Sequence, residues 1–515
     1  MPPTPVIPSV VRKIPLVELQ QVNPWRALIA LCVGFFMILV DSTIVSVATP
    51  AIQEGLHTDI NSVVWVTSAY LLAYAVPLLF TGRLGDRFGP RRLYLAGLAL
   101  FTLSSLWCGL TGTIGMLIAA RVVQGVGAAM MTPQTMSVIT RTFPGEHRGQ
   151  AMSLWGAVAG VATLVGPVVG GLITESWGWE WIFYINVPVG VIGFALAWWL
   201  VPTLPVHSHT FDWVGVSLSG AGLFCLVFGI QEGESYDWGT MWGIISVPLL
   251  IALGVVLMVL FVWWQARTKV DPLVPLALFR DRNFSLANVA ICIVGFVITS
   301  FALPMMIYAQ VVRGLSPVES GLLFVPMAVL AAILSPVVGH LVDRYHPRVI
   351  AGFGLTCLAV GAFWLGAVIG PDTPTWQLVL PMLVLGMANG FMWSPISVTA
   401  TRTLPPQRAG AGSGVYNMTR QMGAVIGSAA IAAVMQARLT HHLGSGAGDY
   451  AATQGKTPVH LPPFVAHGFA RAMGESIYLP AAIAIIAIIA VLFFRNPHGE
   501  RTVIDAPPQR ETAAG

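Results

Sequence analysis

Two ionisable side chains lie deep within long apolar stretches of the sequence, where an unpaired charge is costly and usually marks a functional site. Asp41 stands in Leu-Val-Asp41-Ser-Thr, and Arg121 stands in Ala-Ala-Arg121-Val-Val. A carboxylate can bind and release a proton, whereas a guanidinium stays protonated and changes how readily a neighbouring acid does so. If both stretches are helices, Asp41 and Arg121 lie roughly 15 and 12 Å from the outer ends of those helices. The sequence therefore predicts that the two residues pair and handle protons.

Two purely structural explanations stay open for this pair. Asp41 could be an acid that only holds neighbouring helices together, and Arg121 could bond only to backbone carbonyls of the first helix. Asp41 is, however, the only carboxylate well inside any apolar stretch, which favours a proton-handling role. Other polar residues within apolar stretches are expected to face a cavity: Gln124, Asn389, Asn417 and Arg420.

The chemistry-bearing residues argue against an enzyme, a metal site or a bound cofactor. Acids and histidines do not cluster with catalytic or ligand spacing, and each of the five cysteines stands alone in an apolar run. Gly455-Lys456-Thr457 ends like a phosphate-binding loop, but Tyr450 stands where the first glycine of that loop should be. The net charge of +4 is scattered among short loops, so we expect no nucleic-acid partner.

The composition indicates which elements position these side chains. Hydrophobic residues make up 56% of the chain and charged residues only 9%, whereas soluble proteins carry about 25% charged residues. Apolar stretches of about 18 to 26 residues, enough to cross a bilayer, predict fourteen transmembrane helices. They lie near 25–51, 62–81, 93–112, 114–134, 150–174, 182–203, 213–231, 241–264, 284–309, 318–340, 350–370, 376–398, 413–437 and 477–494.

The positions of Lys and Arg predict the orientation, because these residues accumulate on the cytoplasmic side of a membrane. With the N-terminus inside, 20 of the 26 Lys and Arg residues fall in cytoplasmic segments. Only Arg313, Arg438, Lys456 and Arg471 fall outside. An odd number of helices would place the C-terminus and its basic residues outside, which would weaken this bias. We therefore expect a multi-pass protein of the cytoplasmic (inner or plasma) membrane with both termini in the cytoplasm.

One loop pattern occurs twice, which predicts an internal repeat. The ten residues Gly82–Arg91 match Gly339–Arg348 at six of ten positions, 257 residues apart. Both copies lie on the same predicted side, so the repeats run parallel with six helices each. The sequence predicts an all-α integral membrane protein of two six-helix bundles plus two inserted helices. The expected domains are a cytoplasmic tail at 1–24, a bundle at 25–203, an inserted helix pair at 213–264, a bundle at 284–494 with an external loop at 438–476, and a cytoplasmic tail at 495–515.

With these features the chain resembles the major facilitator superfamily, in its 14-helix drug:proton antiporter branch of the EmrB/QacA type. The resemblance runs from about Trp25 to Arg495 and includes the stretches around Asp41 and Arg121. The repeated loop is similar to the superfamily motif whose acid and arginines latch helix ends together at the cytoplasmic face. The resemblance implies a gating role for Gly82, Asp86, Arg87, Gly89, Arg91 and Arg92, and for Asp343 and Arg344 in the second copy.

Two further stretches carry the same resemblance. The segment 156–171 is similar to a motif associated with exporters in the superfamily, and its spaced glycines allow helices to approach closely. Its residues are Gly156, Gly160, Gly166, Pro167, Gly170 and Gly171. The segment 179–190 resembles the branch's entry to its sixth helix and is also typical of an interfacial aromatic anchor. The first of these motifs favours export over uptake.

These features together predict proton-coupled export of small amphipathic drugs or toxic compounds by alternating access. Aromatic and Met-rich helix faces would suit flat hydrophobic cations or neutral drugs. The alternative is a dedicated exporter of one endogenous metabolite, such as an antibiotic, siderophore or lipid precursor. The expected partners are the lipid bilayer, a small-molecule substrate and protons. An accessory periplasmic or envelope protein stays open, and the functional unit is expected to be a monomer without a cofactor.

Overall fold

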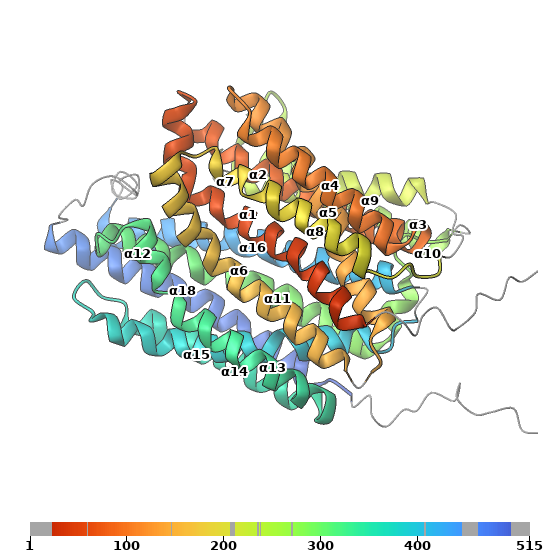
Figure 1. The fold of residues 1–515 in the computed structure, drawn as a ribbon. Helices are drawn as coiled ribbons and strands as arrows, with labels where there is room; N and C mark the ends of the chain where they lie inside the picture. Colours follow the sequence, from red (N-terminus) through yellow and green to blue (C-terminus); the bar gives the residue numbers. More distant parts are fainter. Residues whose placement is uncertain are drawn as a thin grey trace, which may run out of the picture.

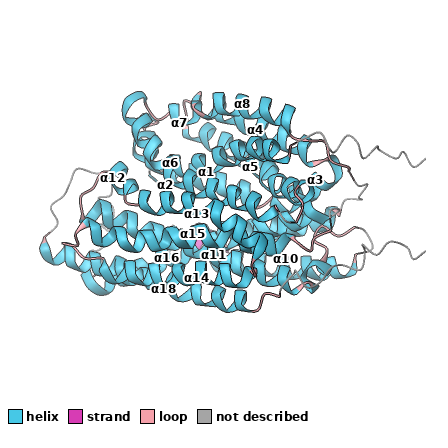
Figure 2. Ribbon diagram, turned by 60° about the horizontal axis from the view of Figure 1, so that its bottom comes forward, coloured by secondary structure: helices cyan, strands magenta, loops and turns pink. Residues whose placement is uncertain are grey.

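The computed structural model describes residues 23–58, 60–145, 147–206, 212–233, 236, 238–268, 271–405, 408–444 and 462–495. Almost all the secondary structure in this part of the chain is helical (Figure 2). The only strands described there are the short antiparallel pair β1 (Thr240–Trp242) and β2 (Ile245–Ser246). Since helices satisfy their own backbone hydrogen bonds, they suit a chain that lies mostly in lipid.

Eight helices form the first half of the molecule, drawn from red to yellow in Figure 1. They are α1 (Pro24–Gly55), α2 (Ile60–Ala75), α3 (Leu78–Phe88), α4 (Pro90–Gly109), α5 (Ile114–Thr142), α6 (Arg148–Trp177), α7 (Trp181–Tyr184) and α8 (Asn186–Leu200). Helix α1 packs against α6 and α8, α2 against α5, and α4 against α5. These contacts gather the first half of the chain into one bundle.

The second half begins with two helices that pack along each other, α9 (Trp213–Gln231) and α10 (Val247–Arg267). A short 3-10 turn, η2 (Leu276–Arg280), leads into the second bundle. That bundle contains α11 (Arg282–Ile307), the π-helical η3 (Tyr308–Val312), α12 (Pro317–Leu322), α13 (Val325–Arg344), α14 (Pro347–Val368), α15 (Thr375–Thr401), α16 (Ala409–Leu443) and α18 (Pro463–Leu492). The two bundles meet mainly where α6 packs against α13 and α15 and where α16 packs against α3 and α5.

Local sequence signals explain where several helices begin or break. Thr113 and Asp281 cap α5 and α11, because their side-chain oxygens accept hydrogen bonds from backbone N–H groups of the first turn. Helices α2 and α3 bend by 47° where Pro77, which has no backbone N–H, interrupts the helical hydrogen bonds. Gly89 ends α3 with a φ of +93°, a conformation that glycine adopts without strain.

In the described residues, twelve helices are long and apolar enough to cross a membrane, and thirteen if the bent pair α2 and α3 is one span. The remaining predicted stretch, at 150–174, is occupied by α6, which has 30 residues. Helix α1 begins and α18 ends on the side of the molecule where α3 and α10 lie (Figure 1). The structure is therefore an all-helical multi-pass membrane protein, while the total of fourteen crossings stays a prediction.

Two predicted boundaries are wrong. The helix expected from 241 begins at Val247, because the preceding residues form the turn between β1 and β2. The external loop expected at 438–476 is shorter, since α16 continues to Leu443 and α18 begins at Pro463. The centre of that predicted loop, at 445–461, lies outside the described residues.

One acid joins the helix ends that project into the predicted loop. On α18, Glu475 Oε2 lies 3.4 Å from Arg438 Nη1, and Glu475 Oε1 lies 3.2 Å from His442 Nε2; both partners are on α16. Hydropathy detects only apolar residues, so these polar helix ends gave no signal in the sequence.

Candidate functional site

Asp41 and Arg121 form an ion pair inside the first bundle. Arg121 Nη1 donates to Asp41 Oδ2 at 2.5 Å, and both side chains have an exposed fraction of 0%. Asp41 comes from the middle of α1 and Arg121 from the first third of α5, at the similar depth that the sequence indicated. Removing either side chain would leave the other as an uncompensated buried charge, so the loss of one partner is expected to destabilise the protein.

Two amide side chains bind the other carboxylate oxygen of Asp41. Gln124 Nε2 and Asn186 Nδ2 each donate to Asp41 Oδ1 at 2.9 Å. Gln124 also accepts from Arg121 Nη1 at 2.7 Å, because residues three apart lie on the same face of α5. Asn186, the first residue of α8, donates in addition to Ser105 Oγ at 3.0 Å. All these partners of Asp41 are donors, which is the set that an ionised carboxylate requires.

The guanidinium of Arg121 has further contacts that fix its position. Its Nε donates to the backbone carbonyl of Val66 in α2 at 3.1 Å. Its Cζ lies 4.1 Å from the ring centroid of Tyr70 and 5.7 Å from that of Phe183, within the range of a cation–π contact. Arg121 Nη2 is buried without a hydrogen-bond partner among the described residues. Arg121 therefore connects α1, α2 and α5 and is not limited to backbone carbonyls of the first helix.

Three members of this network were missed from the sequence. Asn186 lies in the segment 179–190, which we interpreted as an aromatic anchor, although an amide at the start of an apolar helix was an available signal. Ser105 and Tyr70 carry no signal, because a single serine or tyrosine in an apolar helix is ordinary. Gln124 was expected to face a cavity, but its exposed fraction is 0% and its partners are Asp41 and Arg121.

Asp86 and Asp343 occupy equivalent places at one end of the molecule, here called the Asp86/Asp343 end. Asp86 accepts hydrogen bonds from the backbone N–H groups of Gly410 and Ala411, both at 3.0 Å, at the start of α16. Asp343 accepts from the backbone N–H of Gly149 at 2.8 Å, at the start of α6. The first N–H groups of a helix lack partners in the helix and carry positive partial charge. Each acid therefore ties one bundle to the other.

Glycines allow the backbones to approach at both contacts. A Cβ atom on Gly82 would lie 2.5 Å from the carbonyl oxygen of Gly410, and one on Gly339 would lie 2.7 Å from Gln150 Cα. Real Cβ atoms essentially never come so close to backbone atoms. The two copies of the loop pattern thus make matching contacts with the opposite bundle, as a parallel repeat predicts.

Two other residues of the first loop copy have described contacts within their own bundle. Gly89 ends α3, and the Arg91 guanidinium donates to the carbonyl of Trp198 in α8 of the same bundle. The side chains of Arg87, Arg92 and Arg344 are partly or fully exposed. The structure therefore places Gly82 and Asp86 at the interface between the bundles, whereas Gly89 and Arg91 make contacts within the first bundle.

The glycine-rich segment of α6 lies between α1 of its own bundle and α12 and α15 of the second bundle. A Cβ on Gly156 would lie 2.8 Å from the Cβ of Trp393 in α15. A Cβ on Gly171 would lie 2.5 Å from Val318 in α12, so these two glycines face the second bundle. The other members of the segment are Gly166 and Gly170, which approach α1, Gly160, which has open space beside it, and Pro167, which lies within α6.

A cavity of about 110 Å³ lies between the two bundles beside this segment. From the first bundle it is lined by α1 and α6, and from the second by α11, α13, α15 and α16. Two of the predicted cavity residues, Asn389 and Arg420, line it, and so do Gly156 and Gly160. Asn417 does not line it, since its amide is buried and donates to the carbonyl of Ser413.

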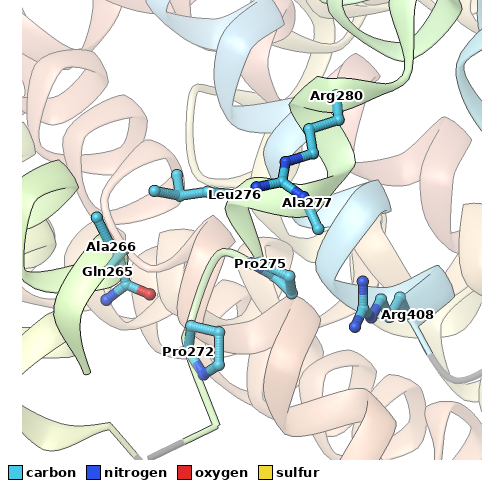
Figure 3. A pocket seen from close by; sticks show the side chains of 8 residues that line it. All are labelled: Gln265, Ala266, Pro272, Pro275, Leu276, Ala277, Arg280 and Arg408. Atoms are coloured by element: carbon cyan, nitrogen blue, oxygen red, sulfur yellow. The ribbon is translucent and has the colours of Figure 1, made fainter. Parts of the chain in front are cut away.

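A larger hollow of about 380 Å³ lies beside η2, the connection into the second bundle (Figure 3). Its walls come from the end of α10, the segment 272–280 and the residue before α16. The side chains that Figure 3 labels include two arginines, Arg280 and Arg408, and none of the residues that the motifs single out. We therefore place the candidate site in the Asp41 network and in the cavity between the bundles.

Comparison with known proteins agrees with this geometry. A family model described as Major Facilitator Superfamily matches residues 31–428. An uncharacterized MFS-type transporter of Mycobacterium tuberculosis is 52% identical over 95% of this chain and 84% of its own length. The tetracenomycin C resistance and export protein of Streptomyces glaucescens is 31% identical over 96% of both chains. The multidrug resistance protein Stp of Mycobacterium tuberculosis is 35% identical over 80% of this chain and 76% of its own.

A solved structure shows the same fold. The proton:xylose symporter XylE, bound to 6-bromo-6-deoxy-D-glucose, superposes with a TM-score of 0.63 at 14% identity. The match covers 92% of this chain and 96% of the symporter. At this identity the likeness concerns the arrangement of the helices and not the transported compound.

Proposed function

Because this chain belongs to the major facilitator superfamily of membrane transporters, we propose that it exports small amphipathic compounds in exchange for protons. The chain is a transporter and not an enzyme, and a small-molecule substrate and the lipid bilayer are its partners. The proposal adds the direction of transport, the coupling ion and the residues that carry them. It also keeps the expectations of a monomer, of both termini in the cytoplasm and of the domain limits given above, apart from those of the external loop.

The buried Asp41 network is the observation that carries proton coupling. Its three nearest side-chain partners, Arg121, Gln124 and Asn186, all donate to Asp41. A proton that binds to Asp41 turns an acceptor-only carboxylate into a group with an O–H donor and weaker acceptors, so these three hydrogen bonds weaken or rearrange. The partners lie on α5 and α8, so protonation changes how α1 packs against both helices. A proton that enters the network can therefore favour one conformation of the bundle over another.

The Asp86/Asp343 end supplies the second half of an alternating-access mechanism. In the structure, the bundles are joined there by Asp86 with Gly410 and by Asp343 with Gly149. The excess of Lys and Arg supports a cytoplasmic position for this end, and in that orientation the structure corresponds to a transporter closed on the inside. Opening to the cytoplasm requires these contacts to separate. Protonation of Asp41 from outside and release of the proton inside would be coupled to that movement.

The direction of transport rests on the relatives and on the segment 156–171. The Streptomyces glaucescens and Stp proteins are named for export and drug resistance. The glycines of the segment, among them Gly156 and Gly171, bring α6 into contact with the second bundle. A helix packed so closely at the interface must slide or tilt when the bundles move, which suits a role in coupling the two conformations.

Reconstituted vesicles test this proposal. The full chain is placed in proteoliposomes with an internal pH indicator, and a pH gradient is imposed across the membrane. We expect the compound against which expression of the chain protects a pump-deficient host to move only while the gradient lasts, with a matched flow of protons in the opposite direction. Transport that continues at the same rate after a protonophore removes the gradient would contradict proton exchange.

A dedicated exporter is the second candidate, because the Streptomyces glaucescens relative, which is named for resistance to and export of one compound, matches 96% of this chain. Growth tests separate the two. A pump-deficient host that expresses the chain is exposed to a panel of chemically unrelated toxic compounds. Protection against many of them supports a multidrug exporter, whereas protection against one chemical series supports a dedicated one. An accessory envelope protein would show as transport that occurs in cells and is lost in proteoliposomes.

A further inference from the structure

The cavity between the bundles contains a positive charge, and two nitrogens of the charged group have no hydrogen-bond partner among the described residues. Arg420 of α16 lines the cavity, and its Nε and Nη2 atoms are buried without a hydrogen-bond partner among the described residues. Trp155 of α6, with an exposed fraction of 2%, lines the same cavity, and its Nε1 also has no described partner. Buried polar groups are normally hydrogen-bonded, and each one left unpaired costs free energy. These unpaired atoms are donors, so what they lack is an acceptor.

The other polar groups of the cavity do not meet this need. Asn389 Nδ2 donates to the carbonyl of Leu385 at 3.0 Å, and Asn389 Oδ1 accepts from Trp393 Nε1 at 3.3 Å. Among the described residues that line the cavity, none is acidic. Asp41 lies elsewhere in the first bundle, where Arg121 already neutralises it. The cavity therefore presents a net positive charge to whatever enters it.

The remaining walls are aromatic and apolar. Phe35 and Trp155 stack with ring centroids 4.7 Å apart and an angle of 24° between the rings. Phe301, Met327 and Trp393 line the cavity with them. Flat rings and a flexible thioether offer favourable contact to a planar ring system. Size adds a constraint: ligand pockets usually measure about 300 to 1,000 Å³, so a cavity of about 110 Å³ must widen as the bundles separate.

Building on the proposed export function, we propose that this cavity binds aromatic compounds through an anionic oxygen group, a carboxylate or a phenolate, held by Arg420 and Trp155. A guanidinium binds carboxylates with paired, charge-assisted hydrogen bonds, and the indole N–H adds a third donor. A cationic drug would meet an unscreened like charge in the same space. The transported compounds are thus acidic aromatics and not the flat hydrophobic cations that the sequence analysis considered.

Binding to the purified full chain tests this inference without transport. Three probes share one ring system and differ in one group: 2-naphthoate, 2-naphthylmethanol and 2-naphthylmethylammonium. Each is equilibrated by dialysis against the chain in nanodiscs of phosphatidylcholine, and empty nanodiscs correct for partition into lipid. We expect 2-naphthoate to bind most tightly and the ammonium probe most weakly. Arg420→Gln should weaken 2-naphthoate binding by about 10- to 100-fold and leave 2-naphthylmethanol nearly unchanged.

Two further variants define the roles of individual groups. Trp155→Phe keeps the ring and removes the indole N–H, so it should weaken only 2-naphthoate, and by less than Arg420→Gln does. Arg438→Gln is the matched control, because Arg438 lies on the same helix, is half exposed and faces Glu475 outside the cavity. That variant should bind all three probes as the unaltered chain does. If Arg420→Gln does not fold, the probe preference of the unaltered chain and the Trp155→Phe result still decide.

Three results would overturn the inference: absence of 2-naphthoate binding, equal affinity for the acid and the ammonium probe, or unchanged affinity in a folded Arg420→Gln variant. None of these depends on a proton gradient. Conversely, a chain that binds 2-naphthoate selectively but moves no compound in cells or in proteoliposomes would contradict the proposed export function alone. The two hypotheses can therefore fail separately.

Discussion

The carboxylate of Asp86 accepts a hydrogen bond from the backbone N–H of Gly410, which lies 324 residues later in the chain, at 3.0 Å. This contact joins α3 of the first bundle to the start of α16 in the second. Asp86 has an exposed fraction of 1% and also accepts from Ala411. Its repeat partner Asp343 accepts from Gly149 and is less buried. The two bundles are thus joined by two similar contacts, of which the one at Asp86 is the more buried.

Asp86→Asn should slow transport by about tenfold or more, because the charge that faces the start of α16 is lost while the shape of the side chain is kept. Asp343→Asn, at the more exposed contact, should have a smaller effect. Transport rates are measured in vesicles and divided by the amount of folded protein. Rates equal to those of the unaltered chain in both variants would remove the gating role from this pair.

Gly156→Ala should destabilise the protein by about 1–3 kcal/mol, since the new Cβ would lie 2.8 Å from the Cβ of Trp393. Gly160→Ala is the matched control four residues later on α6, where no atom lies within 4 Å of an added Cβ. That change should leave the thermal unfolding temperature unchanged or raise it, because alanine favours a helix. Equal unfolding temperatures of the two variants in detergent would show that α6 does not approach α15 as closely as the structure indicates.

Asn186→Ala should weaken proton coupling, because Asp41 Oδ1 loses one of its two amide donors and Ser105 loses a partner. A loss of one hydrogen bond to a charged group is worth about 1.5–3 kcal/mol, so substrate-induced proton release should fall by about tenfold or more. The control is Asn288→Ala, which removes a buried amide of the second bundle that bonds only to the carbonyl of Phe284 among the described residues. Equal proton release by both variants would exclude Asn186 from the network's function.

The orientation can be tested independently of transport. Reporter fusions placed near Gly446 and after Arg495 should give opposite signals, because an odd number of crossings, one, separates the two positions. Among the described residues, that single crossing is α18, which is long and apolar enough to span a membrane. The fusion after Arg495 should report the cytoplasm, in line with the excess of Lys and Arg there. Matching signals would show that the predicted topology is wrong.

The sequence predicts the helical architecture well, because crossing a bilayer demands long apolar stretches and the loop repeat fixes the relation of the halves. It also indicates Asp41 and Arg121, since charges inside apolar helices are rare. It does not reveal Asn186 or Ser105, which gain importance only through helices that pack together in three dimensions. Arg420 was recognised as a cavity residue, but its lack of a partner depends on what lines the opposite wall. Helix ends that project beyond the apolar stretches, as at Leu443 and Pro463, leave no hydropathy signal.

The most direct test compares the unaltered chain with Asp41→Asn in gradient-driven transport. Vesicles that contain equal amounts of each folded protein are loaded with the compound against which the chain protects cells, and a pH jump supplies the gradient. Asn keeps the shape of Asp41 and cannot release a proton, so we expect no gradient-driven transport and no substrate-induced proton release. Asp41→Glu should retain part of both, and Arg121→Lys should retain more transport than Arg121→Ala. Undiminished, gradient-dependent transport by Asp41→Asn would show that the proton travels elsewhere and would contradict the assignment of the coupling site.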